Sequence, residues 1–426
     1  MKIKTKVLPY DEVVKLPHTA HKKPMKPNFA LKRLIKLLAD TDLKKVNFKE
    51  YRVNMERLSK DESCLLLMNH SSFIDLEIVS KLMYPKPYQI VCTSDGFVGK
   101  NTLMRAIGCI PTQKFVNDIN LIKDMKYALQ TLKTSVLMYP EASYSFDGTE
   151  TPLPESLGKC IKLLGVPVVF IKTEGAFLRD PLYNMLQVRN CDVSATMTYL
   201  LSPEDIKEKS YEEINAILKE SFSLDNFKHQ QENRIKIDEP FRADGLNRVL
   251  YKCPHCLDEG HMVGKGVMLT CKNCEAMYTL DEYGYLKAQN VEGKFTHVPD
   301  WFKWERECVR NELIEEKYSL NIDVDICMMV DRKAIYKVGT GKLTHNNEGF
   351  RLTGCDGKLD YKQKPSASYS LYSDYFWYEL GDMICIGDMK TSYYCFPKDC
   401  GDVVAKTRLA AEELYKLDRA KKGIKK

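Results

Sequence analysis

Short apolar runs separated by polar loops dominate the first half of the chain. Residues 63–68 are apolar apart from the leading serine, which is the pattern of a buried strand. Residues 73–82 then carry apolar side chains at the three- and four-residue spacing of a helix. Two more runs, 135–139 and 166–171, have the length and composition of buried strands. Strand, loop and helix patterns in this order predict an α/β domain.

The last hundred residues have a different pattern. In residues 320–426, short runs rich in β-branched and aromatic residues are separated by glycine, asparagine and aspartate. The predicted strands are 324–330, 334–338, 349–352, 368–371, 375–380, 383–386 and 392–396, and a final helix is predicted over 402–417. Seven short strands followed by one helix resemble a pleckstrin-homology-like barrel, in which the helix plugs an open end. Lipid head-group binding, partner binding and scaffolding all remain open for such a domain.

Between these regions, residues 241–290 contain two Cys-x2-Cys pairs. Cys253 and Cys256 form the first pair, and Cys271 and Cys274 form the second after 14 intervening residues. Two such knuckles supply four thiolates at tetrahedral spacing, which predicts a small zinc ribbon with one structural zinc ion. A disulfide framework is disfavoured because the 15 cysteines are an odd number and no secretion signal precedes them. Residues 291–319 are predicted to be a helical linker.

A histidine and an aspartate lie five residues apart directly after the first apolar run. His70 falls in the loop after the predicted strand, and Asp75 falls in the first turn of the predicted helix. Positions five apart diverge on a continuous helix, so the two side chains meet only if the loop bends His70 back over the helix start. An aspartate in contact with one imidazole nitrogen fixes the tautomer and leaves the other nitrogen to take a proton from an alcohol.

Three further blocks follow in order. Residues 108–114 end in Lys114, residues 139–145 contain Pro140-Glu141, and Pro167 is the second residue of the third apolar run. With Asn69-His70 and Asp75, these blocks resemble the glycerolipid acyltransferase family, which includes the 1-acylglycerol-3-phosphate acyltransferases. The resemblance spans about residues 28–220 and implies an α/β acyltransferase domain, a mixed sheet flanked by helices, which we assign to residues 1–240.

The resemblance implies acyl transfer from a thioester, acyl-CoA or acyl carrier protein, to a hydroxyl of a lysophospholipid. His70 would be the general base and Asp75 would stabilise the transient imidazolium. Lys114 would bind the acceptor phosphate, Glu141 would orient the acceptor hydroxyls, and Ser72 would donate to the oxyanion. The expected substrate-binding residues are therefore Asn69, Ser72, Lys114, Glu141 and Ser143.

Two departures from the family pattern affect the acceptor. Ala142 stands where the family has glycine, and Tyr144 stands where it has an arginine that helps to hold the phosphate. Arginine binds phosphate through two parallel hydrogen bonds and tyrosine cannot, so one cationic contact is missing. A lysophospholipid with a larger head group or a glycolipid is therefore an alternative acceptor. A second hypothesis is a catalytically weak member that serves as a lipid- or protein-binding adaptor.

Composition and the N-terminal region point to a protein that works at a membrane surface. No apolar run approaches the roughly 20 residues needed to span a bilayer. Residues 29–38 predict an amphipathic helix with Leu31, Leu34, Ile35 and Leu38 on one face and basic residues beside them. Packing of that face on the domain core is the alternative. We expect a cytoplasmic protein at the inner face of the membrane; the net charge of +6 is modest, and no motif indicates nucleic acid.

Overall fold

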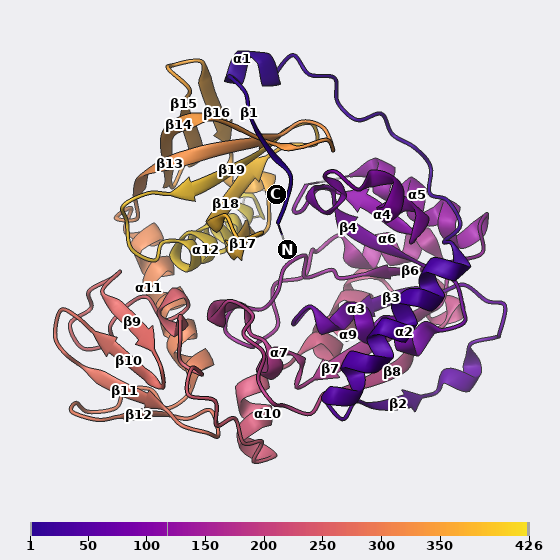
Figure 1. Cartoon of the computed structure of the whole chain (residues 1–426), viewed down its shortest axis with the longest axis horizontal. Helices are drawn as coiled ribbons and strands as arrows, with labels where there is room; N and C mark the ends of the chain where they lie inside the picture. The colour runs from indigo at the N-terminus through magenta and orange to yellow at the C-terminus, as the bar shows by residue number, and fades with distance from the viewer. Residues whose placement is uncertain (1, 117, 424–426) are drawn as a thin grey trace.

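A computed structural model describes residues 2–116 and 118–423 of the chain. Three units are visible in Figure 1: an α/β unit in indigo and magenta, a small sheet in salmon, and a larger sheet in orange and yellow. The two sheets stack on one side, and the α/β unit lies beside them. Their order along the chain follows the order predicted from the sequence.

The α/β unit is built on a seven-stranded sheet in the order β2-β8-β7-β3-β6-β4-β5. Its strands are β2 Lys49–Val53, β3 Leu65–Met68, β4 Tyr88–Thr93, β5 Cys109–Thr112, β6 Ser135–Met138, β7 Val168–Glu174 and β8 Ser194–Leu201. All neighbouring strands are parallel except β7 and β8, which are antiparallel. The mixed sheet predicted for this region is therefore confirmed.

Helices cover both faces of this sheet. They are α2 Phe29–Lys45, α3 Ile74–Met83, α4 Asn101–Ala106, α5 Ile119–Gln130, α6 Leu157–Leu164, α7 Ala176–Arg179, α8 Pro203–Glu208, α9 Tyr211–Phe222 and α10 Asn226–Glu232. Successive side chains of a strand point to opposite faces. Leu66 and Met68 of β3 accordingly share a core with α2 and α3, whereas Leu65 and Leu67 share one with α5, α6 and α9. All four side chains are fully buried, which fixes β3 in the centre of the unit.

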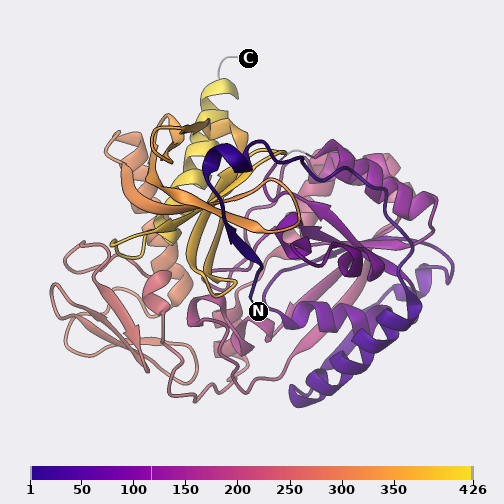
Figure 2. The ribbon, with the colours of Figure 1, turned by 45° about the horizontal axis from the view of Figure 1, so that its top comes forward.

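The predicted amphipathic helix is present as α2, and its apolar residues divide between two faces. Asn28 caps it by accepting a hydrogen bond from the Leu31 amide at 3.1 Å. Ala39 and Leu43 are buried against the sheet, whereas Leu34 and Leu38 are 53% and 65% exposed. Figure 2 shows α2 on the outside of the α/β unit, away from the C-terminal sheet.

The ribbon is a four-stranded antiparallel sheet in the order β12-β11-β10-β9. Its strands are β9 Met262–Lys265, β10 Met268–Cys271, β11 Met277–Leu280 and β12 Leu286–Ala288. Helix α11, Val298–Ile314, follows within the predicted linker. The Trp301 indole of α11 donates to the Lys252 carbonyl at 3.0 Å, and Glu305 accepts from the Lys252 amide at 2.8 Å. The linker helix therefore holds the chain directly before the first cysteine pair.

The C-terminal unit has seven antiparallel strands in the order β16-β15-β14-β13-β19-β18-β17. They are β13 Leu320–Met329, β14 Ile335–Asn346, β15 Gly349–Gly354, β16 Leu359–Gln363, β17 Tyr372–Trp377, β18 Gly381–Gly387 and β19 Ser392–Pro397, followed by α12 Val404–Gly423. The terminal helix agrees with the prediction, but the predicted barrel is wrong, because the end strands β16 and β17 do not pair in the described part of the chain. The predicted strand 368–371 is also wrong, since these residues follow a short 3-10 helix (Pro365–Ala367), and β16 was missed.

The first residues of the chain belong to the C-terminal sheet. Strand β1, Thr5–Val7, pairs in parallel with β14 from Ile335 to Lys337, and helix α1, Tyr10–Val13, follows it. Residues 5–7, which the sequence analysis places in the acyltransferase span of 1–240, thus pair with the last unit of the chain. The segment between β1 and α2 links the C-terminal sheet to the α/β unit (Figure 1).

Candidate active site

The candidate site lies where the central strands of the α/β sheet end. Strands β3 and β6 are parallel neighbours, with Leu65 opposite Val136. Their carboxyl ends therefore meet at the same sheet edge, where open α/β sheets bind ligands. His70 comes two residues after β3, and Glu141 comes three residues after β6. The backbone N–H of His70 donates to Glu141 Oε2 at 2.7 Å, which ties the two loops together.

His70 and Asp75 meet as the sequence predicts. His70 Nδ1 lies 3.0 Å from Asp75 Oδ2, and the same oxygen accepts from the amides of Ser71 at 2.8 Å and Ser72 at 3.2 Å. The loop 69–73 thus bends back over the start of α3, which begins at Ile74. The Asp75 carboxylate is 1% exposed and already accepts from two backbone amides, so it acts as an acceptor toward Nδ1 as well, and Nδ1 is the donor. His70 Nε2 makes no hydrogen bond to a described residue, so it can accept a proton.

Two tyrosine rings enclose the His70 imidazole. The Tyr139 ring lies 4.1 Å from the imidazole centroid, and the Tyr144 ring lies 4.2 Å from it. Burial lowers the pKa of His70, the hydrogen bond and charge of Asp75 oppose that shift, and the charge of Lys114 adds to it. The imidazole is therefore kept neutral, as a general base requires. In the sequence, Tyr144 stands out only because it replaces an arginine of the family pattern. Its contact with His70 could not be predicted from the sequence.

Glu141 has both carboxylate oxygens engaged within the protein. Oε2 accepts from the His70 amide, and Oε1 accepts from the Thr151 amide at 2.8 Å and its hydroxyl at 3.2 Å. Burial raises the Glu141 pKa to about 7. These contacts position the His70 loop, and direct contact of Glu141 with the acceptor stays a prediction.

Asn69 and Ser72 also make contacts that shape the loop. The Asn69 side chain exchanges hydrogen bonds with Thr173 of β7, accepting from its amide at 2.8 Å and donating to its hydroxyl at 2.9 Å. Ser72 is fully buried, and its hydroxyl accepts from the Ile74 amide at 3.3 Å. The structure thus gives both residues a positioning role, and their predicted contact with substrate remains untested.

Ser143 differs from these two residues. It is 3% exposed, and its hydroxyl has no hydrogen-bond partner among the described residues. A buried hydroxyl without a partner costs stability, so this group is available to a ligand. It lies one residue before Tyr144, in the turn that packs on His70.

Lys114 faces the C-terminal unit, which the sequence did not indicate. Its ammonium lies 4.1 Å from the centroid of the Tyr372 ring on β17. The Tyr372 hydroxyl in turn donates to Asp95 Oδ2 at 2.7 Å, in the 3-10 helix Ser94–Phe97 after β4. Burial lowers the pKa of Lys114, while Asp374 and Asp95 oppose that shift. These contacts join residues more than 250 positions apart, and no local pattern predicts them.

A groove of about 1020 Å³ lies beside this site rather than at it. Phe146, Thr151, Phe222 and Arg408 are among its lining residues, so it runs between the α/β unit and helices α11 and α12. Neither His70 nor Asp75 lines it, although Thr151 contacts Glu141. Size alone therefore does not mark the groove as the place of reaction.

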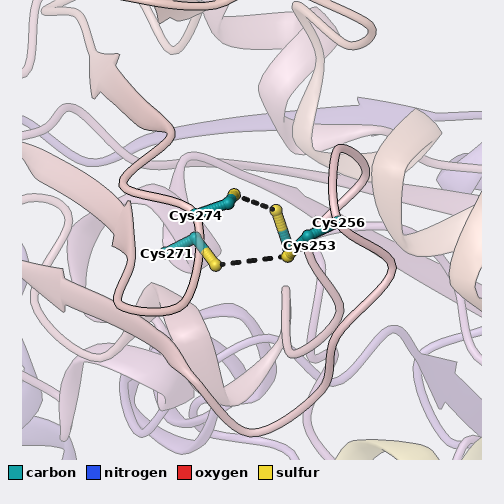
Figure 3. A group of neighbouring side chains, drawn as sticks. All are labelled: Cys253, Cys256, Cys271 and Cys274. Carbon is teal, nitrogen blue, oxygen red and sulfur yellow. Dashed lines mark hydrogen bonds between the residues drawn. The ribbon is translucent and has the colours of Figure 1, made fainter.

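The four predicted zinc ligands come together in the ribbon. The sulfur atoms of Cys253, Cys256, Cys271 and Cys274 all lie within 4.8 Å of one another. Figure 3 shows the four side chains pointing toward one another. The Cys253–Cys274 and Cys256–Cys271 sulfur separations are 3.6 and 3.7 Å. Tetrahedral zinc with zinc–sulfur bonds of about 2.3 Å requires sulfur separations of about 3.8 Å. The residues present therefore fit this metal.

Comparison with known proteins supports an acyltransferase. Residues 51–172 match the family model described as Acyltransferase, a stretch that contains His70, Asp75, Lys114 and Glu141. No curated protein matches the chain. Among solved structures, the 1-acyl-sn-glycerophosphate (LPA) acyltransferase PlsC from Thermotoga maritima is similar at 15% identity, over 45% of this chain and 76% of that one, with a TM-score of 0.34.

Proposed function

We propose that the chain transfers a fatty acyl group from an acyl thioester, acyl-CoA or acyl carrier protein, to a hydroxyl of a lysophospholipid. The observation that carries the proposal is the His70–Asp75 pair. His70 follows β3, Asp75 lies in the first turn of α3, and Nε2 of His70 is turned away from Asp75. The match of residues 51–172 to the Acyltransferase family supports the reaction class. Donor and acceptor are inferred from the site residues.

The reaction needs one base and no covalent enzyme intermediate. His70 Nε2 removes the proton of the acceptor hydroxyl as the oxygen attacks the thioester carbonyl carbon. The tetrahedral intermediate collapses by breaking the carbon–sulfur bond, and the imidazolium returns the proton to the leaving thiolate. Asp75, 3.0 Å from Nδ1, stabilises the imidazolium while it carries the positive charge.

The remaining site residues divide into two groups. Asn69, Ser72 and Glu141 hold the loops through the hydrogen bonds given above, so we assign them to positioning the base. Lys114 and Ser143 remain our candidates for contact with substrate. Lys114 supplies a positive charge for an acceptor phosphate, and Ser143 supplies a free buried hydroxyl.

We also propose that α2 docks the enzyme on the inner face of the membrane. Leu34, Leu37 and Leu38 are each more than half exposed, and Phe29 at the start of the helix is 58% exposed. Core packing therefore leaves this face uncovered, and leucines flanked by lysines fit an anionic lipid interface. No helix in the described ranges 2–116 and 118–423 is long and apolar enough to cross a bilayer.

Zinc would hold the ribbon together in this protein. Four cysteine ligands close the coordination shell and leave no position for water, so the metal would supply folding free energy and take no part in the reaction. The ribbon cysteines Cys253 and Cys271 belong to the same hydrophobic core as Phe146 and Tyr183 of the α/β unit. Stability of the ribbon is thus linked to the surroundings of the active site.

Replacing the base tests the proposed function. His70→Ala should lower kcat for acyl transfer to a lysophospholipid by about 10²- to 10⁴-fold while the protein remains folded. His229→Ala is a matched control, because His229 lies in the same unit and is 24% exposed against 21% for His70, and its ring contacts Glu174 at 4.0 Å and Asn233 at 3.2 Å, away from the His70 loop. Activity of His70→Ala near the wild-type level would exclude the mechanism. A wild-type chain inactive on every lysolipid and donor would instead favour the adaptor hypothesis.

A further inference from the structure

The C-terminal unit builds one wall of the space beside His70. Strand β17 places Tyr372 against Lys114 and Asp95, and its neighbour Tyr369 donates to the Pro140 carbonyl at 3.3 Å. Pro140 directly precedes Glu141. Both substrate loops of the α/β unit, after β5 and after β6, therefore contact the appended unit.

This wall combines aromatic rings with carboxylates. The Trp377 indole donates to the Tyr372 hydroxyl at 2.9 Å, and that hydroxyl donates to Asp95. Asp374 lies on β17 two residues from Tyr372, so both side chains point to the same side of the strand. We call Asp95, Tyr372, Asp374 and Trp377 the acidic-aromatic box.

The box has more negative than positive groups. It contains two carboxylates, and Lys114 is the cation that faces them. The arginine that the family pattern would place at position 144 is absent, and Tyr144 lies there instead. A terminal phosphate with two negative charges would therefore meet the carboxylates with one compensating lysine.

Two observations indicate that the box accommodates a cation. First, the Lys114 ammonium already lies over the face of Tyr372, at a distance where the ring attracts positive charge. Second, Asp95 is 2% exposed, and while its Oδ2 accepts from Tyr372, its Oδ1 has no partner among the described residues. A buried carboxylate oxygen without a donor is destabilising unless a ligand supplies one.

From this geometry we infer that the acidic-aromatic box binds the ammonium of a zwitterionic acceptor, a lysophospholipid with an amine head group. Lys114 then pairs with the phosphodiester of the same molecule, and His70 Nε2 meets its free hydroxyl. The inference rests on the proposed function and names its acceptor class. It makes Asp374, from the C-terminal unit, a residue that determines specificity.

The test compares two acceptors that differ only in the head group, and lysophosphatidate is assayed as a third. Lysophosphatidylethanolamine carries an ammonium, and lysophosphatidylglycerol carries hydroxyls in its place. We expect wild type to have a kcat/KM at least about tenfold higher with the first. Asp374→Asn should reduce that ratio by about tenfold, mainly through KM, since a single charge pair within about 10 Å contributes that factor at an effective dielectric of 20. Assays at pH 8 and fixed ionic strength keep Asp374 ionised, because burial raises its pKa to about 7.

Tyr369→Phe is the matched control, since it lies at the same interface and removes one hydrogen bond without changing the box. It should leave the acceptor ratio unchanged. Trp377 fluorescence gives a second readout without turnover, when both lysolipids are titrated into His70→Ala.

Three results would overturn the inference. They are a wild type that shows no preference for the ammonium acceptor, a wild type that prefers lysophosphatidate, and an acceptor ratio that is the same in Asp374→Asn and wild type. In each case acyl transfer itself would stand. Loss of transfer to all three lysolipids in wild type would remove the proposed function as well.

Discussion

Asp75→Asn separates the charge of Asp75 from its role in shaping the loop. One oxygen of Asp75 accepts from His70 Nδ1, Ser71 N and Ser72 N, so an asparagine that keeps its oxygen at this position retains all three hydrogen bonds. The amide nitrogen would then replace Oδ1, which is buried without a partner. The variant thus keeps the tautomer and removes the negative charge.

The magnitude follows from the distance. With 3.0 Å between Nδ1 and Oδ2, the charge centres of imidazolium and carboxylate lie about 4 Å apart, which corresponds to about 4 kcal/mol at an effective dielectric of 20. The asparagine dipole recovers part of this, so we expect a loss of about 2–4 kcal/mol in the transition state and a kcat about 30- to 1000-fold lower. The buried amide nitrogen costs a further 1–3 kcal/mol, roughly, in the free energy of unfolding.

A pH profile distinguishes this explanation from general damage. The base must be neutral, so activity falls as the pH drops through the His70 pKa. Because Asp75 opposes the lowering of that pKa by burial, Asp75→Asn should move the acid limb of kcat/KM to lower pH. The pKa of Glu141, about 7 in wild type, should also fall in this variant, since the charge of Asp75 adds to the rise that burial causes.

The control is Asp124→Asn, which removes another buried carboxylate that bonds a histidine, His21 Nε2 at 2.9 Å, and that has no hydrogen bond to the His70 loop among the described residues. It should lower the melting temperature and leave the acid limb in place. Asp75→Asn activity close to wild type, or an acid limb that moves to higher pH, would refute the assigned role.

Two further predictions concern the metal and the membrane. Wild type should contain one zinc ion per chain. Cys256→Ser should lose the zinc and melt at a lower temperature, whereas Cys308→Ser, which lies outside the cluster, should keep it. Less than about half an equivalent of zinc in wild type would contradict the site. Replacing Leu34 and Leu38 by aspartate should weaken binding to anionic vesicles by at least about tenfold in a flotation assay. The reason is that burying each leucine side chain in the membrane contributes about 1.5 kcal/mol or more to the free energy of binding. Leu163→Asp, at an equally exposed leucine on α6, is the control, and equal binding of both variants would exclude docking through α2.

Local patterns sufficed where the chemistry depends on neighbours in sequence. The apolar run before His70 predicted β3, and the five-residue spacing predicted the His70–Asp75 contact, because both depend on one strand, one loop and one helix start. The cysteine spacing likewise predicted the four-sulfur cluster. In each case the residues involved share one supersecondary unit.

Long-range packing set the limit of prediction in the C-terminal unit. Strand β16 alternates between more and less buried positions, but its charged residues Asp360 and Lys362 leave too few apolar residues for the sequence to predict a strand there. Strand β1 has three residues and pairs with a strand more than 300 positions away, so no periodicity indicates it. Residues 368–371 have β-forming composition, yet they approach the α/β unit, where Tyr369 bonds to Pro140.

Long-range packing also explains why the departure at position 144 looked, in the sequence alone, like the loss of a binding contact. Judged alone, a tyrosine in place of an arginine removes a phosphate contact. In the folded chain the Tyr144 ring packs on His70. Burial raises the pKa of Tyr144, and the charge of Asp374 from the C-terminal unit adds to that rise. An arginine at that position would place a cation beside both the base and Lys114, whose charge already lowers the His70 pKa. A neutral ring together with an acidic wall from the second unit instead gives a site with lower positive charge, which suits an acceptor that brings its own cation.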